Sequence, residues 1–154
     1  MTRKTALIKI SGDLLLKKAI IDKIRKISKK YLTVIVVGGG IQINEAFGQK
    51  GLPVKFGPLG RETNSLKEKQ LARKILKKNQ IKIQDLLAKE NIAATVTIPF
   101  IDVSSVLCPV NGDIFALTTY LGFDHLYIFT LKVREKQKRK EFEKYPKIKV
   151  IGFQ

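Results

Sequence analysis

The sequence predicts an α/β fold: a three-layer α/β/α sandwich with a mainly parallel central sheet. Two short runs, Thr5–Ile10 and Leu32–Val37, are almost entirely apolar, which is typical of central parallel strands buried on both faces. Each run ends in glycine and is followed by a helical pattern. Strands that alternate with helices in this way form parallel sheets with right-handed crossovers.

The same periodicities assign the rest of the chain. In chain order we expect a helix over 14–30, a helix over 41–51, a loop or short hairpin over 52–61, helical segments over 63–78 and 81–91, a strand over 93–99, an irregular or partly extended stretch over 101–109, a helix over 111–122, a strand over 126–130, a charged helix or flexible loop over 132–144, and a segment over 147–153 that could form a last strand. Without a repeat or a low-complexity linker, 1–154 is predicted to be one domain.

Composition excludes several function classes. The chain is 44% hydrophobic, yet no apolar run approaches the ~20 residues of a membrane span. Lys9 interrupts the first apolar stretch, so we do not expect a signal peptide. We expect instead a cytoplasmic protein without a membrane partner. Cys108 is the only cysteine and His125 the only histidine. This excludes an internal disulfide and multi-histidine metal sites, and argues against a Ser-His-Asp triad.

The formal net charge of +17 has two interpretations. The favoured one is a set of solvated lysine faces, because lysines outnumber arginines and spread over several segments. The other is binding to polyanions: nucleotides, phosphorylated metabolites or nucleic acid. Nucleic acid has little support, since no binding motif or cluster of stacking aromatic residues is present.

Three small-residue loops follow predicted strands: Ser11-Gly12, Gly38-Gly39-Gly40 and the turn before Asn111-Gly112-Asp113. In parallel sheets, ligands bind beyond the carboxyl ends of the strands. The triple glycine also opens a helix, so its backbone N–H groups and the helix dipole could hold an anion. The alternative is a tight turn without a ligand, and we favour a phosphate site.

Lys9 lies inside the first buried strand, where a lysine is costly unless it reaches a polar site. Either it extends to solvent or it directs a cation into the site, and we favour the second. Asp113, in the first turn of a predicted helix at the same sheet edge, is its expected partner. Taken alone, Asp113 would be only a helix N-terminal residue favoured by the dipole.

Four segments together resemble the amino-acid kinase family, which includes acetylglutamate kinase and uridylate kinase. They are Lys9-Ile10-Ser11-Gly12, Gly38-Gly39-Gly40-Ile41-Gln42-Ile43-Asn44, Gly60-Arg61-Glu62-Thr63 and Val110-Asn111-Gly112-Asp113. The triple-glycine block and the Asn-Gly-Asp helix start are the specific parts. The resemblance runs from about residue 7 to 130.

The resemblance implies a small-molecule kinase that uses ATP and Mg²⁺ to phosphorylate a small anionic metabolite, a carboxylate, carbamate or phosphate. It implies that Lys9 neutralises the transferred group and that Asp113 holds this lysine. Phosphate and nucleotide contacts would come from Lys9, Ser11, Gly12, Gly38, Gly39 and Gly40. Acceptor contacts would come from Gly39, Gly40, Arg61 and Asn111.

Assembly and the end of the chain leave alternatives open. Family members often pair, and Ala46, Phe47 and the 66–76 region could form a homodimer face or could fill the core. The segment 131–154 is predicted to be a shortened, basic replacement for the nucleotide-binding half. Residues 132–149 carry nine basic and three acidic residues, which could form a phosphate clamp or a mobile arm.

Departures from the family pattern open a second function. Leu131 stands where an aspartate is common, and Pro109 replaces a polar residue. Lys132, Arg134 or Lys136 could replace a second cation, but no spacing selects one. The alternative function is a non-catalytic anion- or nucleotide-binding module of the same fold. The acceptor is not identified by the sequence.

Overall fold

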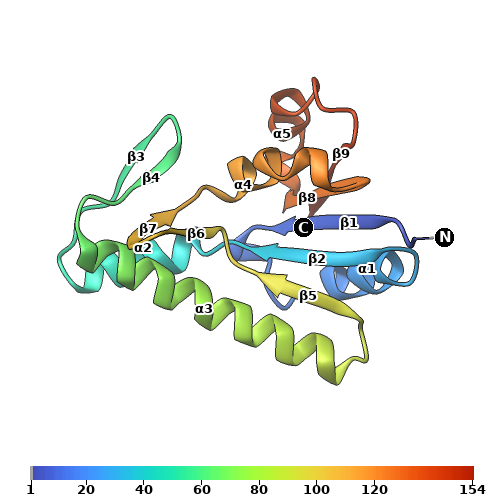
Figure 1. The fold of residues 1–154 in the computed structure, drawn as a ribbon, viewed down its shortest axis with the longest axis horizontal. Coiled ribbons are helices and arrows are strands. Elements are labelled where there is room, and N and C mark those ends of the chain that lie inside the picture. Colours follow the sequence, from blue (N-terminus) through green and yellow to red (C-terminus); the bar gives the residue numbers. More distant parts are fainter. Residues whose placement is uncertain (1) are drawn as a thin grey trace.

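The computed structural model describes residues 2–154 and contains a five-stranded sheet of order β5-β2-β1-β8-β9 (Figure 1). Every pairing in this sheet is parallel. β1 (Thr5–Ile10) lies between β2 (Leu32–Val37) and β8 (His125–Leu131), while β5 (Ala94–Thr97) and β9 (Ile148–Phe153) form the edges. The prediction that β1 and β2 are neighbouring parallel strands is confirmed.

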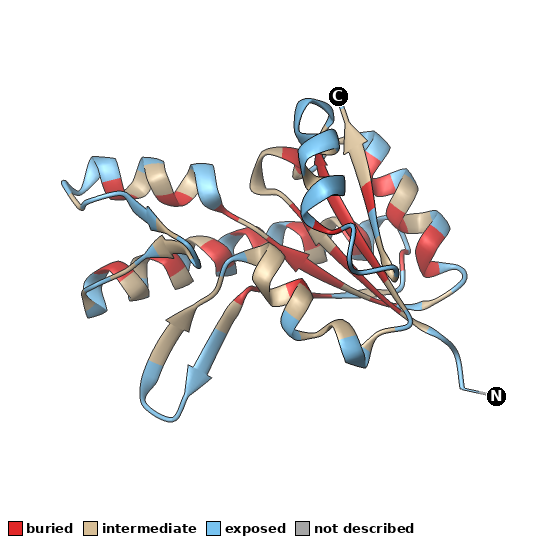
Figure 2. Cartoon of the chain, turned by 90° about the horizontal axis from the view of Figure 1, so that it is seen from above, coloured by how far each residue is buried: buried red, intermediate tan, exposed pale blue. Residues whose placement is uncertain are grey.

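Helices cover both faces of the sheet. α1 (Lys18–Ser28), α2 (Gly40–Gln49) and α3 (Leu66–Lys89) pack on one face, in a core that includes Ile8 and Ile35. α4 (Gly112–Thr118) packs on the other face against a smaller core that includes Leu7. Figure 2 shows the buried strands running through the middle of the molecule. The predicted layers, helices on both faces of a parallel sheet, are therefore present.

Two hairpins extend beyond the carboxyl ends of the strands (Figure 1). The first joins β3 (Lys55–Gly57) to β4 (Gly60–Glu62), and the second joins β6 (Phe100–Val103) to β7 (Val106–Pro109). The sequence did not assign strands to either region, because prolines and glycines interrupt the alternation of apolar and polar residues in such short strands. The hairpins form side walls of the site described below.

Several helix boundaries differ from the predicted ones. Leu14 ends a short 3-10 turn, η1 (Gly12–Leu14), and Leu16 has a φ of 69°, so α1 begins only at Lys18. α3 is one helix of 24 residues rather than two segments. The polar residues in its middle, Asn79 and Gln80, donate to backbone carbonyls of neighbouring loops and strands instead of breaking the helix.

The segment after β8 is an ordered part of the sheet and not a mobile arm. It forms η3 (Lys132–Arg134), α5 (Glu135–Glu141) and the edge strand β9, which pairs with β8 from Leu126 to Leu131.

The predicted helix over 111–122 ends earlier, at Thr118, and is followed by the 3-10 turn η2 (Tyr120–Gly122). Among residues 2–154, no helix has both the length and the apolar character to cross a membrane.

Residues suggested for a dimer face lie in the core of the monomer. Phe47 and Ala72 are fully buried and Leu76 is nearly so. Their burial matches the alternative that they fill the core, whereas Leu66 is exposed. A homodimer remains a prediction that this chain alone does not test.

Candidate functional site

A cavity of about 290 Å³ lies beyond the carboxyl ends of β1, β2 and β8. Loops from these strands, the two hairpins, α3 and the segment after β8 all contribute walls. Every site residue predicted from the sequence lines it: Lys9, Ser11, Gly12, Gly38, Gly39, Gly40, Arg61, Asn111 and Asp113. The structure thus brings together residues that are distant in sequence, at the edge where parallel sheets bind ligands.

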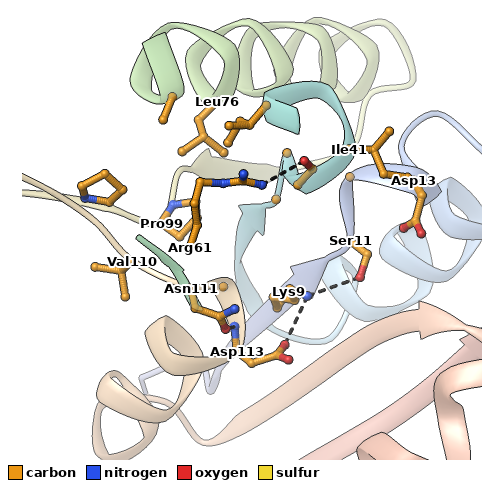
Figure 3. A pocket seen from close by; sticks show the side chains of 18 of the residues that line it. Lys9, Ser11, Asp13, Ile41, Arg61, Leu76, Pro99, Val110, Asn111 and Asp113 are labelled. Carbon is orange, nitrogen blue, oxygen red and sulfur yellow. Dashed lines mark hydrogen bonds and ion pairs between the residues drawn. The ribbon is translucent and has the colours of Figure 1, made fainter. Parts of the chain in front are cut away.

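Lys9 lies at the centre of the charged part of the cavity (Figure 3). Its Nζ is 3.1 Å from Asp113 Oδ1, close enough for an ion pair although without hydrogen-bond geometry, and it donates to Ser11 Oγ at 3.3 Å. Gly112 makes this approach possible, because a Cβ there would lie 2.8 Å from Lys9 Cε. Lys9 therefore extends from its strand into the polar site rather than to solvent.

Lys138 of α5 is the second cation on Asp113. Its Nζ donates to Asp113 Oδ2 at 2.8 Å and to Glu141 at 2.7 Å. Burial alone would raise the pKa of Asp113, but the charge of Lys9 and the hydrogen bond from Lys138 outweigh burial and lower it. Burial likewise opposes the charge on Lys138, while its bonds to Asp113 and Glu141 raise its pKa. Asp113 and Lys138 therefore stabilise each other's ionised forms.

Asn111 positions this cluster through the start of α4. Its Oδ1 accepts hydrogen bonds from the N–H groups of Asp113 (2.9 Å) and Ile114 (3.3 Å), the arrangement of an N-cap. Gly60 packs against the same side chain with a φ of 103°, and a Cβ there would lie 2.8 Å from Asn111 Cβ. Asn111 lines the cavity, but its side-chain oxygen is already used by the helix.

The glycine loop is held by side chains of two helices. Gly38 N–H donates to Ile10 O at 2.9 Å, which continues the β1–β2 pairing. Gln42 Nε2 donates to Gly12 O, and Asn79 Nδ2 donates to Gly38 O, both at 3.0 Å. A Cβ on Gly12 would lie 3.0 Å from Gly39 Cα, so the two glycine loops are in close contact.

Asn79→Ala is expected to lower the free energy of unfolding by about 1–3 kcal/mol, because the carbonyl of Gly38 would lose a buried partner. Asn79 is only 4% exposed. Urea denaturation measures the change, with Gln70→Ala on the exposed face of α3 as the control. Equal stabilities for the two variants would contradict this role of Asn79.

Arg61 lies at another part of the cavity, away from the Lys9 cluster (Figure 3). Its guanidinium carbon is 4.8 Å from the ring centre of Phe56 and 5.6 Å from that of Phe47. Nη2 donates to Gly40 O at 3.0 Å, whereas Nη1 is buried and has no hydrogen-bond partner among residues 2–154. Burial lowers the pKa of Arg61, although a guanidinium stays protonated in proteins.

An apolar wall completes the cavity. Its members come from α2, α3 and the β6–β7 hairpin with its flanking residues: Ile43, Ala72, Leu76, Pro99, Pro109 and Val110. Such a surface accommodates the carbon skeleton of a ligand while polar groups fix its ends. The proline that replaced a polar residue in the sequence comparison is thus part of an apolar surface.

Some site residues were not predicted from the sequence. Of the three cations suggested as replacements, only Arg134 lines the cavity, 3.9 Å from Asp13. Lys132 instead pairs with Glu135, and Lys136 is exposed. Lys138 was missed, although it lies four residues before the buried Phe142 and so on the inward face of α5. Within residues 2–154, no group of three or more His, Cys, Asp or Glu could hold a metal ion.

Comparison with known proteins gives neighbours in fold. The chain matches smu.665 from Streptococcus mutans UA159 with a TM-score of 0.63 and 16% identity, over 92% of this chain and 84% of that one. It also matches N-acetylglutamate synthase from Neisseria gonorrhoeae, complexed with coenzyme A and N-acetyl-glutamate, with a TM-score of 0.54 and 14% identity. That match covers 86% of this chain and 42% of the synthase chain. No family model and no curated protein matches.

These comparisons correct the functional expectations drawn from the resemblance. The neighbour with bound ligands is a synthase that holds coenzyme A and N-acetyl-glutamate, and not a kinase with ATP and Mg²⁺. The assignment to the amino-acid kinase family, the ATP-dependent phosphotransferase function, the nucleotide-binding alternative and the cofactors ATP and Mg²⁺ are therefore not carried forward. Short glycine motifs recur in many α/β proteins, which is why they misdirect an assignment of activity. At such low identities, the likeness establishes the fold alone.

Proposed function

We propose that the cavity is the substrate site of a small-molecule enzyme that acts on a small carboxylate metabolite. The observation that carries this proposal is Arg61: a half-buried guanidinium, held by Gly40 O and two aromatic rings, whose buried Nη1 has no hydrogen-bond partner among residues 2–154. Arginine binds a carboxylate through paired hydrogen bonds, which are stronger than those between neutral groups.

The remainder of the cavity fits the rest of such a ligand. The apolar wall suits an acyl group or a short carbon chain, and about 290 Å³ accommodates a small metabolite. Lys9 contacts Asp113 in the same cavity, and the ion pair of Asp113 and Lys138 contributes two groups with shifted pKa values. Shifted pKa values beside a cavity are a feature of enzyme sites.

An N-acylated acidic amino acid is the first ligand to test, since the synthase structure that this fold resembles contains N-acetyl-glutamate. Because the chain spans only 42% of that synthase, we propose the acidic ligand alone. Binding of coenzyme A is to be measured in a separate titration. The reaction catalysed is not specified by these residues.

Arg61→Gln is expected to weaken the binding of N-acetyl-glutamate roughly 100-fold, about 2.7 kcal/mol, because a charged pair of hydrogen bonds would be lost. Isothermal titration calorimetry measures the change. Arg73→Gln is the matched control: Arg73 also lies over a phenylalanine ring, at 5.7 Å from Phe100, but it pairs with exposed Asp102 outside the cavity. The same affinity in all three proteins would refute a carboxylate site at Arg61.

A further inference from the structure

The charged side chains that line the cavity are not balanced. Four are cations, Lys9, Arg61, Arg134 and Lys138, and two are carboxylates, Asp13 and Asp113. The lining therefore has two more cations than carboxylates, although solvent screens the charge of Arg134, which is 54% exposed. Glu141 also contacts Lys138, at 2.7 Å, but it is 40% exposed and lines a neighbouring groove that shares Asp113 and Lys138 with the cavity. Solvent screens such an exposed carboxylate, so it holds the ammonium without fully neutralising it.

The cations are divided between two places. Arg61 is fixed near the start of α2 through Gly40 O, whereas Lys9 and Lys138 meet on Asp113 at the start of α4. Figure 3 shows Arg61 apart from the pair of Lys9 and Asp113, with the cavity between them. Two places of positive charge can bind two anionic groups on one ligand, each at its own end.

Donor counts at the second place leave capacity for an anion. An ammonium group carries three N–H donors. Lys9 has two polar neighbours, Ser11 and Asp113, and Lys138 also has two, Asp113 and Glu141. Each lysine can thus direct a third N–H to a ligand. Asp13, beside Arg134, has a buried Oδ1 without a hydrogen-bond partner among residues 2–154, so this end also retains an acceptor.

We infer that the cavity selects a ligand with two acidic groups, and that Lys138 on α5 is the residue that recognises the second acidic group. This inference rests on the proposed function, in which Arg61 binds the first carboxylate. It gives α5 a role in specificity: the helix holds its cation over the cavity through Asp113 and through the buried Phe142 one turn later. N-acetyl-glutamate has two carboxylates of this kind, whereas N-acetyl-glutamine has one.

The test measures the binding of these two ligands by calorimetry at a fixed ionic strength of ~0.15 M, where charges beyond ~8 Å are screened. The wild-type chain is expected to bind N-acetyl-glutamate on the order of 10-fold more tightly or better, as expected for a charge-assisted contact. In Lys138→Met this preference should fall to less than about 3-fold, with the affinity for N-acetyl-glutamine unchanged. Lys138→Arg retains the charge and should retain most of the preference.

Lys140→Met is the matched control, because Lys140 is exposed on the same helix and does not line the cavity. It should leave the preference unchanged, which separates a local contact from the general attraction of a chain with charge +17. Thermal unfolding of each variant confirms that it is folded.

The outcomes separate the two proposals. Equal binding of both ligands by the wild-type chain, or an equal loss for both in Lys138→Met, would overturn the discriminating role and leave the carboxylate site at Arg61. Failure of the wild-type chain to bind either ligand would overturn the proposed function and this inference together. Loss of both ligands in Arg61→Gln, with a preference that depends on Lys138, supports both.

Discussion

Phe129→Ala is expected to lower the free energy of unfolding by about 3–5 kcal/mol, the usual cost of removing a fully buried aromatic ring. Phe129 lies in β8, is completely buried, and its ring centre is 5.0 Å from that of Phe153 in the neighbouring β9. The substitution would leave a cavity in the larger core, on the face of the sheet that α1, α2 and α3 cover. Such a loss is a large fraction of the stability of an ordinary domain.

Urea denaturation followed by circular dichroism measures this loss. Leu121→Ala is the control, because Leu121 is 91% exposed in η2 and its removal should change stability by less than about 0.5 kcal/mol. A loss below about 1 kcal/mol for Phe129→Ala would show that β8 and β9 do not share a packed core.

Asp113→Asn is expected to cost about 2–4 kcal/mol at neutral pH, because two partly buried ammonium groups would lose their shared counter-charge. The side chains of Lys9, Asp113 and Lys138 are only 12%, 16% and 22% exposed. An isosteric amide keeps the shape of the site, so the effect reports charge. Asp102→Asn, which disturbs the exposed pair with Arg73, should cost less than about 1 kcal/mol.

The same variant should show a defined dependence on pH. The folded state lowers the pKa of Asp113, so its carboxylate contributes stability above its unfolded pKa, near 3.9. This contribution is lost as the pH falls through the lower folded value. The difference in stability between wild type and Asp113→Asn should be constant from about pH 5 to pH 9 and should narrow below about pH 4. A difference that grows on acidification would contradict the pairing.

Local pattern in the sequence was enough to predict the sheet. The apolar, largely β-branched runs of β1 and β2 are stable in water only when both faces of each strand are buried. Strands buried in this way are typical of parallel sheets, so their composition predicted parallel pairing. The division of α3 into two helices, on either side of Asn79 and Gln80, was wrong. Their partners, Gly38 O and Val96 O, lie on other elements, and no local pattern reveals such contacts.

In the candidate site too, residues with a local signal were predicted and residues defined by long-range contacts were not. Lys9, Asp113 and the glycine loops could be nominated because a charge or a glycine near the end of a strand is locally conspicuous, whereas Arg61 was nominated only through the resemblance. Lys138 lies in a run of basic residues; its spacing from Phe142 predicts an inward position, but its contact with Asp113, 25 residues away, is visible only in the structure. The activity could not be predicted at all, since the same loops at the same sheet edge serve many chemistries.

The strand order also determines when the site can exist during synthesis. β1 is made first yet lies at the centre of the sheet, and one of its two neighbours, β8, is made more than a hundred residues later. The Thr5 N–H, for example, donates to an Asp124 carboxylate 119 residues along the chain. Contacts of this span slow folding, because a long loop must close before they form. While the chain emerges, β1 and β2 would therefore keep open strand edges, and Lys9 could meet Asp113 only after the intervening residues 10–112 have been made. The nascent chain is most prone to wrong strand pairing in this interval.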